Sequence, residues 1–544
     1  MGTSSRAARI AALSTRTFDL LVIGGGITGC GVAHDAARRG LDVALVEKED
    51  FASGTSSRSS RLIHGGVRYL EHGHLHLVFE SSAERRRLLR LAPHLVHPLE
   101  FTWPVYAGAR IPRWKLAAGL LVYDALSLFR NVGRHRRLGA RDVLAREPAL
   151  RQDGLRGGAS YFDASTDDAR LTLAAALSAM DAGATLVNHA VVRDLIGAGG
   201  KICGAVVIDT LDGSDTLGQN VIEVRARVVV NATGPWSDEL RRLDGETRQA
   251  VRGSKGAHIV VPRDRLGAQG AVTLLTPRDQ RVCFVLPHGA LTMIGTTDTF
   301  TAESPDDVRA TAGDVEYLLE VANTFYPDAR LSPADVVCAW AGIRPLIPTD
   351  DQSPRSASRE HLVSVSGHGL VSIAGGKLTT YRVMAADAVD IVLRQLGRPT
   401  ARSTTDTQPI HGGDIVSVSA GVRDASRTIG DAALASQLVR SYGSKWRDVW
   451  ATIISTSDGA TRLGPPGVTV GELRYSAERE LAETLGDLLV RRTRLAFHTR
   501  DNARSVARDA ARAVAPVLGW DGTRVEREIT AFEAEVARLF TVDA

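Results

Sequence analysis

Short apolar runs separated by amphipathic segments predict a strand, a helix and a second strand at the start of the chain. Residues 18–23 form an apolar run typical of a buried strand, and residues 29–39 have helical spacing. Gly40 is well placed to end that helix, because glycine readily adopts the left-handed conformation found at helix C-termini. Residues 41–46 form a second apolar run, which ends at Glu47. This order predicts a βαβ unit.

The rest of the chain predicts sheets in the middle and helices at the end. Helical spacing is found at residues 80–150, 167–182, 378–396 and 420–544. Strand patterns are found at residues 186–196, 202–209, 228–231 and 361–376. Residues 258–295 contain several short strand-like runs separated by Pro and Gly, which indicates an antiparallel sheet.

The composition narrows the class of protein. At 544 residues, with 44% hydrophobic and 24% charged residues, we expect a folded protein of two or three domains. A net charge of +4 argues against a dedicated nucleic-acid binder. The four cysteines form no C-x-x-C pair, so we expect neither a metal site nor a disulfide framework, which fits a cytoplasmic protein. No run of 18 apolar residues is present, and we expect residues 1–17 to be a disordered tail.

A glycine motif lies between the first predicted strand and the first helix. Gly24, Gly26 and Gly29 form G-x-G-x-x-G. In this motif the first glycine permits a tight turn, and the second lets the backbone approach a pyrophosphate that the helix N-terminus also attracts. Glu47 ends the second strand, where a carboxylate can bind both ribose hydroxyls. The combination predicts a dinucleotide site.

Two later segments favour FAD over NAD as the dinucleotide. Residues 231–236 (NATGPW) follow a strand, and residues 375–382 (GGKLTTYR) follow another strand and begin a helix. Distant segments that return to one site suit a large flavin, and the second helix N-terminus could face the electron-rich end of a reduced flavin. We therefore predict an FAD site that includes Ala232, Gly234 and Gly376.

Five further motifs, in order along the chain, are more specific than the glycine motif. They lie at residues 55–71 (TSSRSSRLIHGGVRYLE), 167–171 (DDARL), 253–258 (GSKGAH), 295–298 (GTTD) and 342–346 (GIRPL). Together they resemble the motifs of the FAD-dependent glycerol-3-phosphate dehydrogenases, within the wider glycine-oxidase and D-amino-acid-oxidase type of flavoprotein. The resemblance covers about residues 18–400 and extends more weakly into the C-terminal helices. Arg61 departs from the family pattern, which has lysine before Leu-Ile-His.

The resemblance implies an α/β fold, α+β overall, with a discontinuous Rossmann-type FAD-binding domain. We expect the parts of that domain at residues 18–80, 151–240 and 341–400, a mainly helical insertion at 81–150, an antiparallel substrate-binding domain at 241–340, a linker at 401–415 and a helical C-terminal domain at 416–544. The resemblance also implies that sn-glycerol 3-phosphate is oxidised to dihydroxyacetone phosphate, with electrons delivered to a quinone at the membrane surface.

The substrate carries a phosphate dianion, which the bidentate guanidinium of arginine suits best. By match to the family motifs, Arg68 and Arg344 are expected to bind the substrate and to take part in catalysis, with Arg344 the stronger phosphate candidate. A surface salt bridge is the alternative role for either arginine. Tyr69, Lys255 and His258 are expected to complete the substrate site.

Oxidation of the alcohol also needs a group that takes the hydroxyl proton, and histidine is the usual base near neutral pH. His64 lies in the most specific motif and is a catalytic candidate, although an imidazole that only contacts the flavin is an equal alternative. His258 is open to the same two interpretations, as a site residue or a core histidine. An arginine in a perturbed environment is a third candidate for the base.

Lys377 and several neighbouring groups are expected to serve the flavin. A positive charge at the flavin N1–O2 edge would favour hydride acceptance, so Lys377 is a catalytic and cofactor-binding candidate, with a plain helix-start lysine as the alternative. The remaining cofactor candidates, which could otherwise be ordinary loop residues, are Leu378, Thr379, Thr55, Ser56 and Ser57.

Residues 111–130 combine Trp114 and leucines with basic side chains, and Arg134, Arg136 and Arg137 follow. Such a segment suits a helix that lies on an anionic membrane surface; a domain-packing helix with a basic edge is an equal alternative. With the quinone chemistry that the resemblance implies, this favours a cytoplasmic protein peripherally associated with the inner face of the cell membrane.

A glycerol-3-phosphate oxidase that uses oxygen is the nearest rival function. An amine or amino-acid oxidase and an inactive flavin-binding subunit are more distant rivals, and a homodimer is left open.

Overall fold

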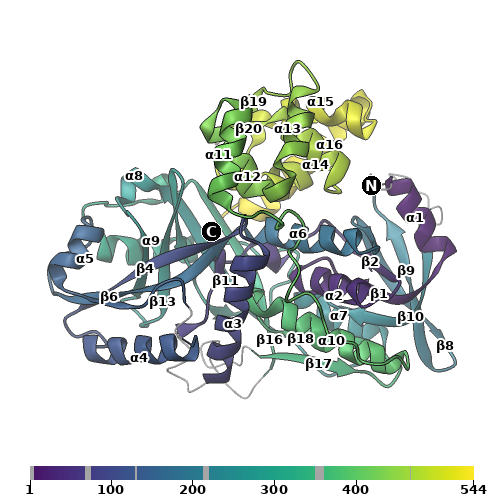
Figure 1. Ribbon diagram of the computed structural model, residues 1–544, viewed down its shortest axis with the longest axis horizontal. Coiled ribbons are helices and arrows are strands. Elements are labelled where there is room, and N and C mark those ends of the chain that lie inside the picture. Colours follow the sequence, from purple (N-terminus) through teal and green to yellow (C-terminus); the bar gives the residue numbers. More distant parts are fainter. Residues whose placement is uncertain are drawn as a thin grey trace.

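Two β-sheets lie side by side beneath a layer of C-terminal helices (Figure 1). The computed structural model describes residues 5–67, 75–128, 131–211, 220–348, 360–465 and 467–543. Within these ranges no helix is both long enough and apolar enough to cross a bilayer. The arrangement confirms the expected α/β fold with an antiparallel second sheet and a helical C-terminal region.

The first sheet has a parallel core, in keeping with the continuous apolar runs of its strands. β1 (Thr17–Ile23) pairs in parallel with β2 (Val43–Val46) on one side and with β10 (Val221–Asn231) on the other. Both faces of a parallel sheet are covered, which explains why β2 is buried along its whole length. The strand order is β17 (His361–Val365), β18 (Val371–Gly375), β10, β1, β2 and β7 (Thr185–Val187), with β9 (Lys201–Asp209) and β8 (Ala190–Ala198) extending from β10.

Helices from distant parts of the chain meet on this sheet. α2 (Ile27–Arg38) packs against both α6 (Asp168–Asp181) and α10 (Tyr381–Gln395). Gly31 permits the close approach of α10, because a Cβ at this position would lie 2.9 Å from the Tyr381 ring. Segments from the beginning, middle and end of the first 400 residues therefore share one hydrophobic core.

The second sheet is largely antiparallel and draws strands from several regions of the sequence. Its order is β15 (Thr299–Phe300), β11 (Arg252–Pro262), β14 (Leu291–Gly295), β13 (Val282–His288), β12 (Ala271–Leu275), β4 (Val96–Tyr106), β6 (Leu155–Thr166) and β3 (Leu62–Ile63). β16 (Cys338–Leu346) also pairs with β11, and β5 (Arg136–Leu138) pairs with β6. α9 (Ala312–Phe325) packs on β11 and closes the core on that side.

β4 corrects the expectation that residues 81–150 form a mainly helical insertion. The region does contain α3 (Leu75–Leu91), α4 (Arg113–Leu126) and α5 (Ala140–Arg146), but β4 crosses the second sheet between β12 and β6. Pro98 and Pro104 are unusual inside a strand, and they hide it from a pattern-based prediction. The strand nevertheless buries all of residues 101–106, so the region is part of the sheet.

Residues 6–15 form a helix, which corrects the expectation of a disordered tail. α1 (Arg6–Thr15) begins after Ser5, whose hydroxyl accepts a hydrogen bond from the backbone N–H of Ala8. Leu13 is fully buried, and Arg9 forms an ion pair with Glu483 at 3.2 Å. The segment is ordered by one buried leucine and by ion pairs to distant residues, which its own sequence does not reveal.

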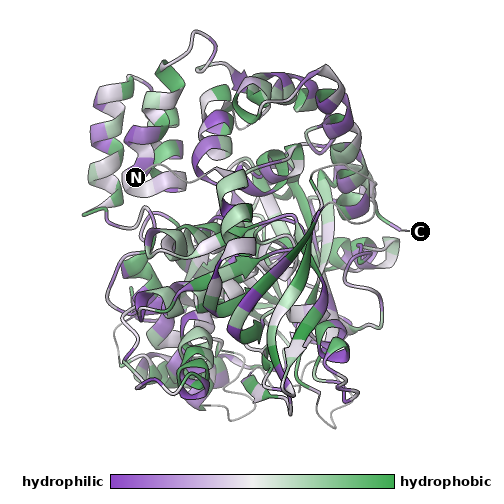
Figure 2. Cartoon of the chain, turned by 90° about the vertical axis from the view of Figure 1, so that its right-hand side faces the viewer, coloured by the Kyte–Doolittle hydropathy of each residue, from purple (hydrophilic) through white to green (hydrophobic). Residues whose placement is uncertain are grey.

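The C-terminal region is helical, as expected. Figure 2 shows these helices above the rest of the molecule, with ribbons that alternate between hydrophilic and hydrophobic residues, as helices with one buried face do. They are α11 (Val418–Ile429), α12 (Ala432–Tyr442), α13 (Trp446–Ile454), α14 (Val470–Arg479), α15 (Arg504–Leu518) and α16 (Gly522–Phe540), with a π-helical turn at Asp487–Arg492. The same region contains the short strands β19 (Arg462–Leu463) and β20 (Val468–Thr469), and the short helices α7 (Ser237–Leu243) and α8 (Arg263–Leu266) lie earlier in the chain.

Candidate active site

A cavity of about 450 Å³ opens where the parallel strands of the first sheet end. Its wall contains the end of β1, the start of α2 and the segments that follow β2, β10 and β18. Ligands of open α/β sheets bind outside the carboxyl ends of the strands, so the topology favours this cavity as the cofactor site. Most of the expected cofactor residues line it: Gly24, Gly26, Glu47, Thr55, Ser56, Ala232, Gly234, Gly376, Lys377 and Leu378.

The geometry of the glycine motif fits a bound pyrophosphate. Gly24 has a φ of 110°, a conformation that residues with side chains rarely adopt. A Cβ on Gly29 would lie 1.9 Å from the carbonyl oxygen of Gly24, so Gly29 allows α2 to pack on the preceding turn without itself lining the cavity. Gly26 borders the cavity at the N-terminus of α2. The N–H groups and dipole of this helix end suit an anionic group.

Glu47 presents a fixed carboxylate at the edge of the same cavity. The residue is 8% exposed and accepts hydrogen bonds from the backbone N–H groups of Gly25, at 2.5 Å, and Glu49, at 2.9 Å. Burial raises the pKa of this carboxyl, while the two backbone donors act in the opposite direction. The donors fix its orientation, and a carboxylate retains acceptor capacity for ribose hydroxyls.

The serine-rich loop brings only some of its members to the cavity. Ser56 Oγ accepts a hydrogen bond from the backbone N–H of Ile27 at 3.0 Å, and the Thr55 hydroxyl donates to the carbonyl of Ile343 at 2.6 Å. Ser57 is buried, borders neither cavity and faces the carbonyl of Gly54. The structure therefore does not bring Ser57 to the expected cofactor site, because the tight turn directs successive side chains to different sides.

A second cavity, of about 270 Å³, lies next to the first and shares part of its wall. Thr55, Ser56 and residues 376–378 border both cavities. Its other side is formed by the second sheet, chiefly β11, β13 and β16. Four residues expected at the reacting end of the site also border it, namely His64, His258, Arg344 and Thr379.

Arg344, on β16, is held in a defined orientation at this cavity. Its Nη1 lies 3.1 Å from Asp298 Oδ1, and its Nη2 donates to the Thr296 hydroxyl at 3.0 Å. The Ser254 hydroxyl in turn donates to Asp298 at 2.5 Å. A Cβ on Gly256 would lie 2.4 to 2.7 Å from the guanidinium, so this glycine makes the room that the guanidinium occupies.

His258, on β11, is a buried neutral imidazole. It is 2% exposed, its Nε2 lies 2.9 Å from the Ser60 hydroxyl, and its ring stacks on Trp340 with centroids 5.4 Å apart. Burial, with the nearby cations Arg344 and Arg61 acting in the same direction, lowers the pKa of His258 to about 3. Its Nδ1 has no hydrogen-bond partner in the parts of the chain that the structure describes.

His64, Thr379 and Lys377 come together from segments more than 300 residues apart. The backbone N–H of His64 donates to the Thr379 hydroxyl at 3.2 Å. Lys377 lines both cavities, and its Nζ donates to the Ser81 hydroxyl of α3 at 3.2 Å. The structure thus brings these three predicted residues to the wall of the second cavity, and Lys377 also borders the first.

Lys255 does not reach the cavity. Successive side chains of a strand point to opposite faces, and on β11 the residues Gly256 and His258 border the cavity whereas Lys255 points away from it. Its Nζ lies 3.2 Å from Asp314 and 3.6 Å from Glu303, which corrects its expected role in substrate binding. Arg68 and Tyr69 lie outside the described residues.

Arg281, on the loop between β12 and β13, borders the second cavity and was not predicted from the sequence. Its Nη1 donates to the backbone carbonyl of Asp298, so it shares an anchor with Arg344. Arg110 also borders the cavity. Both arginines lie outside the motifs, and only the pairing of the strands brings them near Arg344.

A buried polar network beneath His64 also went unpredicted. The Tyr123 hydroxyl on α4 and Asp163 on β6 lie 2.6 Å apart, and each lies 3.0 Å from the backbone N–H of Gly65. Arg85, on α3, forms an ion pair with Asp163 and donates to Tyr123 at 2.6 Å. The network supports the loop that carries His64, and its members are spread too widely along the chain to form a motif.

The strand-end cavity, the glycine motif and the adjoining second cavity define an oxidoreductase that binds a flavin dinucleotide. Residues 19–382 match the FAD dependent oxidoreductase family, and residues 403–525 match the C-terminal domain of alpha-glycerophosphate oxidase. Glycerol-3-phosphate dehydrogenase 2 of Mycobacterium tuberculosis (strain ATCC 25618 / H37Rv) is 40% identical, with 98% of this chain and 91% of that protein covered. Aerobic glycerol-3-phosphate dehydrogenase of Bacillus subtilis (strain 168) is 36% identical, with 88% of each covered.

Solved structures agree with these matches. The glycerol-3-phosphate dehydrogenase from Bacillus halodurans complexed with FAD has a TM-score of 0.81 and 33% identity, with 98% of this chain and 97% of that chain covered. Glycine oxidase from Geobacillus kaustophilus, at 22% identity and a TM-score of 0.52, shares the fold. The chain therefore belongs to the FAD-dependent glycerol-3-phosphate dehydrogenases, within the FAD-dependent oxidoreductase family. The expected cofactor, FAD, is confirmed.

Proposed function

We propose that the protein oxidises sn-glycerol 3-phosphate to dihydroxyacetone phosphate and passes the electrons to a quinone in the membrane. The observation that carries this proposal is Arg344, an oriented guanidinium in a cavity that adjoins the FAD site. The names of the relatives support the substrate. FAD, when bound, supplies the hydride acceptor, while residues of the chain bind the substrate and take its proton.

The phosphate group is assigned to Arg344 and Arg281. Asp298 accepts from Arg344 through its carboxylate and from Arg281 through its backbone carbonyl, which keeps the two guanidinium groups close together, and Arg281 also pairs with Asp279. A charge-assisted hydrogen bond from one of them to the phosphate contributes about 1.5–3 kcal/mol. Arg68 and Tyr69, which belong to the most specific family motif, complete the site in this proposal.

His258 is assigned as the base that accepts the hydroxyl proton of the substrate. Its lowered pKa, about 3, keeps the imidazole unprotonated near neutral pH, so that it can accept a proton. A phosphate dianion in the same cavity would raise that pKa, because an opposite charge nearby favours the imidazolium. His64, on the wall of the second cavity, is then left with a role in positioning the cofactor.

Lys377 is assigned to the redox chemistry because it borders both cavities. A cation at their junction favours acceptance of negative charge by the bound cofactor. Ser81 accepts from its Nζ and holds the side chain at this position. Thr379, hydrogen-bonded to the backbone of His64, joins the same wall.

The exposed face of α4 supports delivery of electrons at a membrane. Trp114, Leu121 and Leu128 recur every seven residues along and just beyond this helix and are 73%, 54% and 50% exposed. Phe79 on α3, which packs beside α4, is also exposed. Arg113 and Lys115 lie at the start of α4, and exposed Arg134, Arg136 and Arg137 follow it. An apolar stripe with a basic border suits an anionic lipid surface.

The test is an anaerobic titration of the purified FAD-loaded protein with sn-glycerol 3-phosphate, observed by flavin absorbance. We expect rapid bleaching in the wild type and a large loss of bleaching rate in Arg344→Ala at the same substrate concentration. An unbleached wild-type flavin would reject the substrate. Glycerol without phosphate serves as the matched negative substrate.

The rival function, a glycerol-3-phosphate oxidase, is separated by the second half-reaction. After bleaching, the reduced protein is mixed either with oxygen or with a quinone analogue in vesicles. Reoxidation at least as fast by oxygen as by the quinone, with peroxide formed, would favour the oxidase. We expect the quinone to react much faster, because the apolar face of α4 gives a lipid-dissolved acceptor a place to meet the protein.

A further inference from the structure

The loop of residues 48–53, which follows Glu47, forms one side of the FAD cavity. Lys48 and Ser53 line the cavity directly. The backbone N–H of Glu49 donates to Glu47 Oε1 at 2.9 Å, and the Ser53 hydroxyl lies 3.5 Å from the same oxygen. The position of this loop therefore determines how Glu47 presents its carboxylate to the cofactor.

Asp50 anchors this loop to the C-terminal region of the chain. It is fully buried, and its Oδ2 accepts from Arg491 Nε at 2.7 Å and from Arg492 Nη1 at 2.6 Å. Its Oδ1 accepts from Arg492 Nη2 at 2.9 Å and from Asn188 Nδ2 at 3.0 Å. Both arginines are buried and lie on the π-helical turn Asp487–Arg492. Two consecutive residues of one turn thus hold a single carboxylate of the FAD-binding region.

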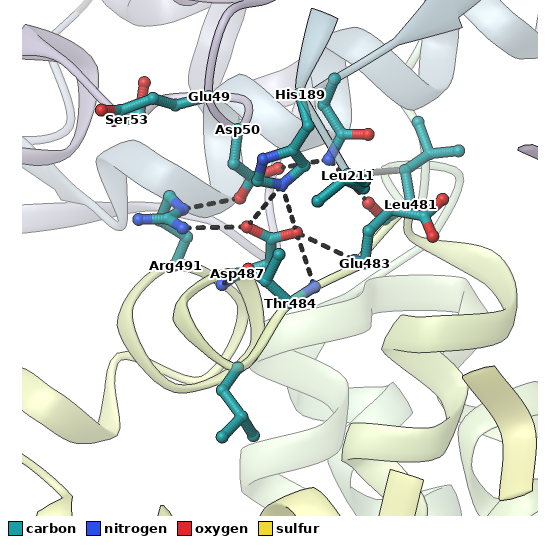
Figure 3. A network of polar contacts seen from close by, with 12 residues as sticks. Glu49, Asp50, Ser53, His189, Leu211, Leu481, Glu483, Thr484, Asp487 and Arg491 are labelled. Carbon is teal, nitrogen blue, oxygen red and sulfur yellow. Dashed lines mark hydrogen bonds and ion pairs between the residues drawn. The ribbon is translucent and has the colours of Figure 1, made fainter. Parts of the chain in front are cut away.

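The same π-helical turn is also connected to the 48–53 loop through a second series of hydrogen bonds. Figure 3 shows Arg491 between Asp50 and Asp487. Arg491 Nη2 donates to Asp487 Oδ1 at 2.9 Å, and Asp487 Oδ2 lies 2.9 Å from His189 Nε2. The backbone N–H of His189 donates to the carbonyl of Glu49 at 2.5 Å. The loop is therefore held through Asp50 and through Glu49 by one connected network.

We propose that Arg491 and Arg492 are positioning residues for FAD: through Asp50 they hold the 48–53 loop, and thereby Glu47, in the geometry that binds the cofactor. Neither arginine borders either cavity, so the effect passes through the loop. A buried carboxylate that loses a cationic partner is left with uncompensated charge and tends to move toward water. By linkage, FAD binding and the docking of the C-terminal region then stabilise each other.

The test is the dissociation constant for FAD, measured on full-length apoprotein by quenching of flavin fluorescence. We expect Arg492→Gln, Arg491→Gln and Asp50→Asn each to raise this constant by roughly 5- to 150-fold, the usual range for coupling between sites. Arg492→Lys keeps the charge but loses the two-pronged contact, so it is expected to fall between Arg492→Gln and the wild type. Graded recovery by lysine would mark the ion pair itself as the cause.

Arg474→Gln is the matched control. Arg474 bonds to Asp458 and to the carbonyl of Ala513, both within the C-terminal region, and makes no contact with the loop. We expect this variant to lower the unfolding temperature without changing the FAD dissociation constant. If the Arg491 and Arg492 variants behave like Arg474→Gln, the proposal is overturned. It is equally overturned if Asp50→Asn weakens FAD binding and the arginine variants do not.

A variant that folds poorly is handled by a linkage measurement on the same proteins. Saturating FAD is expected to raise the unfolding temperature of the wild type and of Arg474→Gln by the same amount, and that of Arg492→Lys by less. An equal rise of the unfolding temperature in all three proteins would show that the ion pairs do not affect FAD binding. The readout uses no substrate, so its outcome does not depend on the proposed reaction.

Discussion

Arg344 owes its usefulness as an anion-binding residue to Asp298 and Thr296, which fix its two terminal nitrogens. Arg344→Ala removes the guanidinium, and the loss of one charge-assisted contact of about 1.5–3 kcal/mol predicts a fall in kcat/KM of roughly 10- to 150-fold. Steady-state rates with a soluble dye as acceptor measure this. Arg225→Gln, on an exposed arginine, is the control and should leave the rate unchanged.

Gly256 tests the same site without removing any functional group. A Cβ at this position would overlap the Arg344 guanidinium, at 2.4 to 2.7 Å, so Gly256→Ala should displace it from Asp298. We expect KM for sn-glycerol 3-phosphate to rise about tenfold, roughly 1.4 kcal/mol, with an unchanged flavin spectrum. An unaltered KM would show that the phosphate is bound elsewhere. A changed spectrum would instead place the disturbance at the cofactor.

The lowered pKa values of buried histidines predict that the folded protein loses stability as the pH falls. Burial lowers the pKa of His94 to about 3, with Arg170 and His411 acting in the same direction. An unfolded histidine binds its proton near pH 6.5, so between about pH 6.5 and pH 3 the unfolded state holds more protons, and stability falls as pH falls. Each such histidine contributes a slope of up to about 1.4 kcal/mol per pH unit.

Denaturant unfolding at pH 6.5, 5.5 and 4.5 measures this slope. His94→Gln should reduce the slope of the unfolding free energy against pH by nearly the contribution of one bound proton. His76→Gln, on an exposed histidine, should not reduce it. Equal slopes in all three proteins would contradict the assignment of a neutral His94 in the folded state. His258, whose pKa is also near 3, adds to the slope equally in the wild type, His94→Gln and His76→Gln.

At the scale of elements, α4 shows an apolar face on the outside of the molecule. Trp114→Ser combined with Leu121→Ser should weaken binding to anionic vesicles roughly tenfold or more, since each exposed side chain of this size gains about 1.5–3 kcal/mol on burial. Co-sedimentation with vesicles measures the change. Val416→Ser, on an exposed valine of the C-terminal region, should have no effect. Equal binding by all three would place the membrane contact on another surface.

Elements whose structure depends on residues close together in the sequence were predictable. The βαβ unit and its glycine motif lie within 30 residues, so local patterns alone were enough to place β1, α2 and Glu47 together. The second sheet could not be predicted in full, because β4 and β6 pair across some 60 residues and β4 contains two prolines. The same limit explains the misplaced Lys255, since a motif names residues but strand alternation decides which of them face the site.

At the scale of the whole molecule, the cofactor site is built from three directions. The first sheet supplies the dinucleotide cradle, the second sheet supplies Arg344 and His258, and the C-terminal helices hold the 48–53 loop through Asp50. Long-range ion pairs of this kind leave no local pattern in the sequence. They connect the region that matches the FAD dependent oxidoreductase family, residues 19–382, to the separate helical region.

The same arrangement predicts that substrate oxidation and electron delivery can be separated by mutation. The inner face of α4 supports the His64 loop through Tyr123, while its outer face carries the apolar stripe. Trp114→Ser with Leu121→Ser changes only exposed side chains, so the rate with a soluble dye should stay within about twofold of the wild type. With a quinone in anionic vesicles, the rate should fall roughly tenfold, in step with vesicle binding. Parallel loss of both rates would indicate a damaged active site. Full retention of the quinone rate would mean that electrons leave the protein by another route.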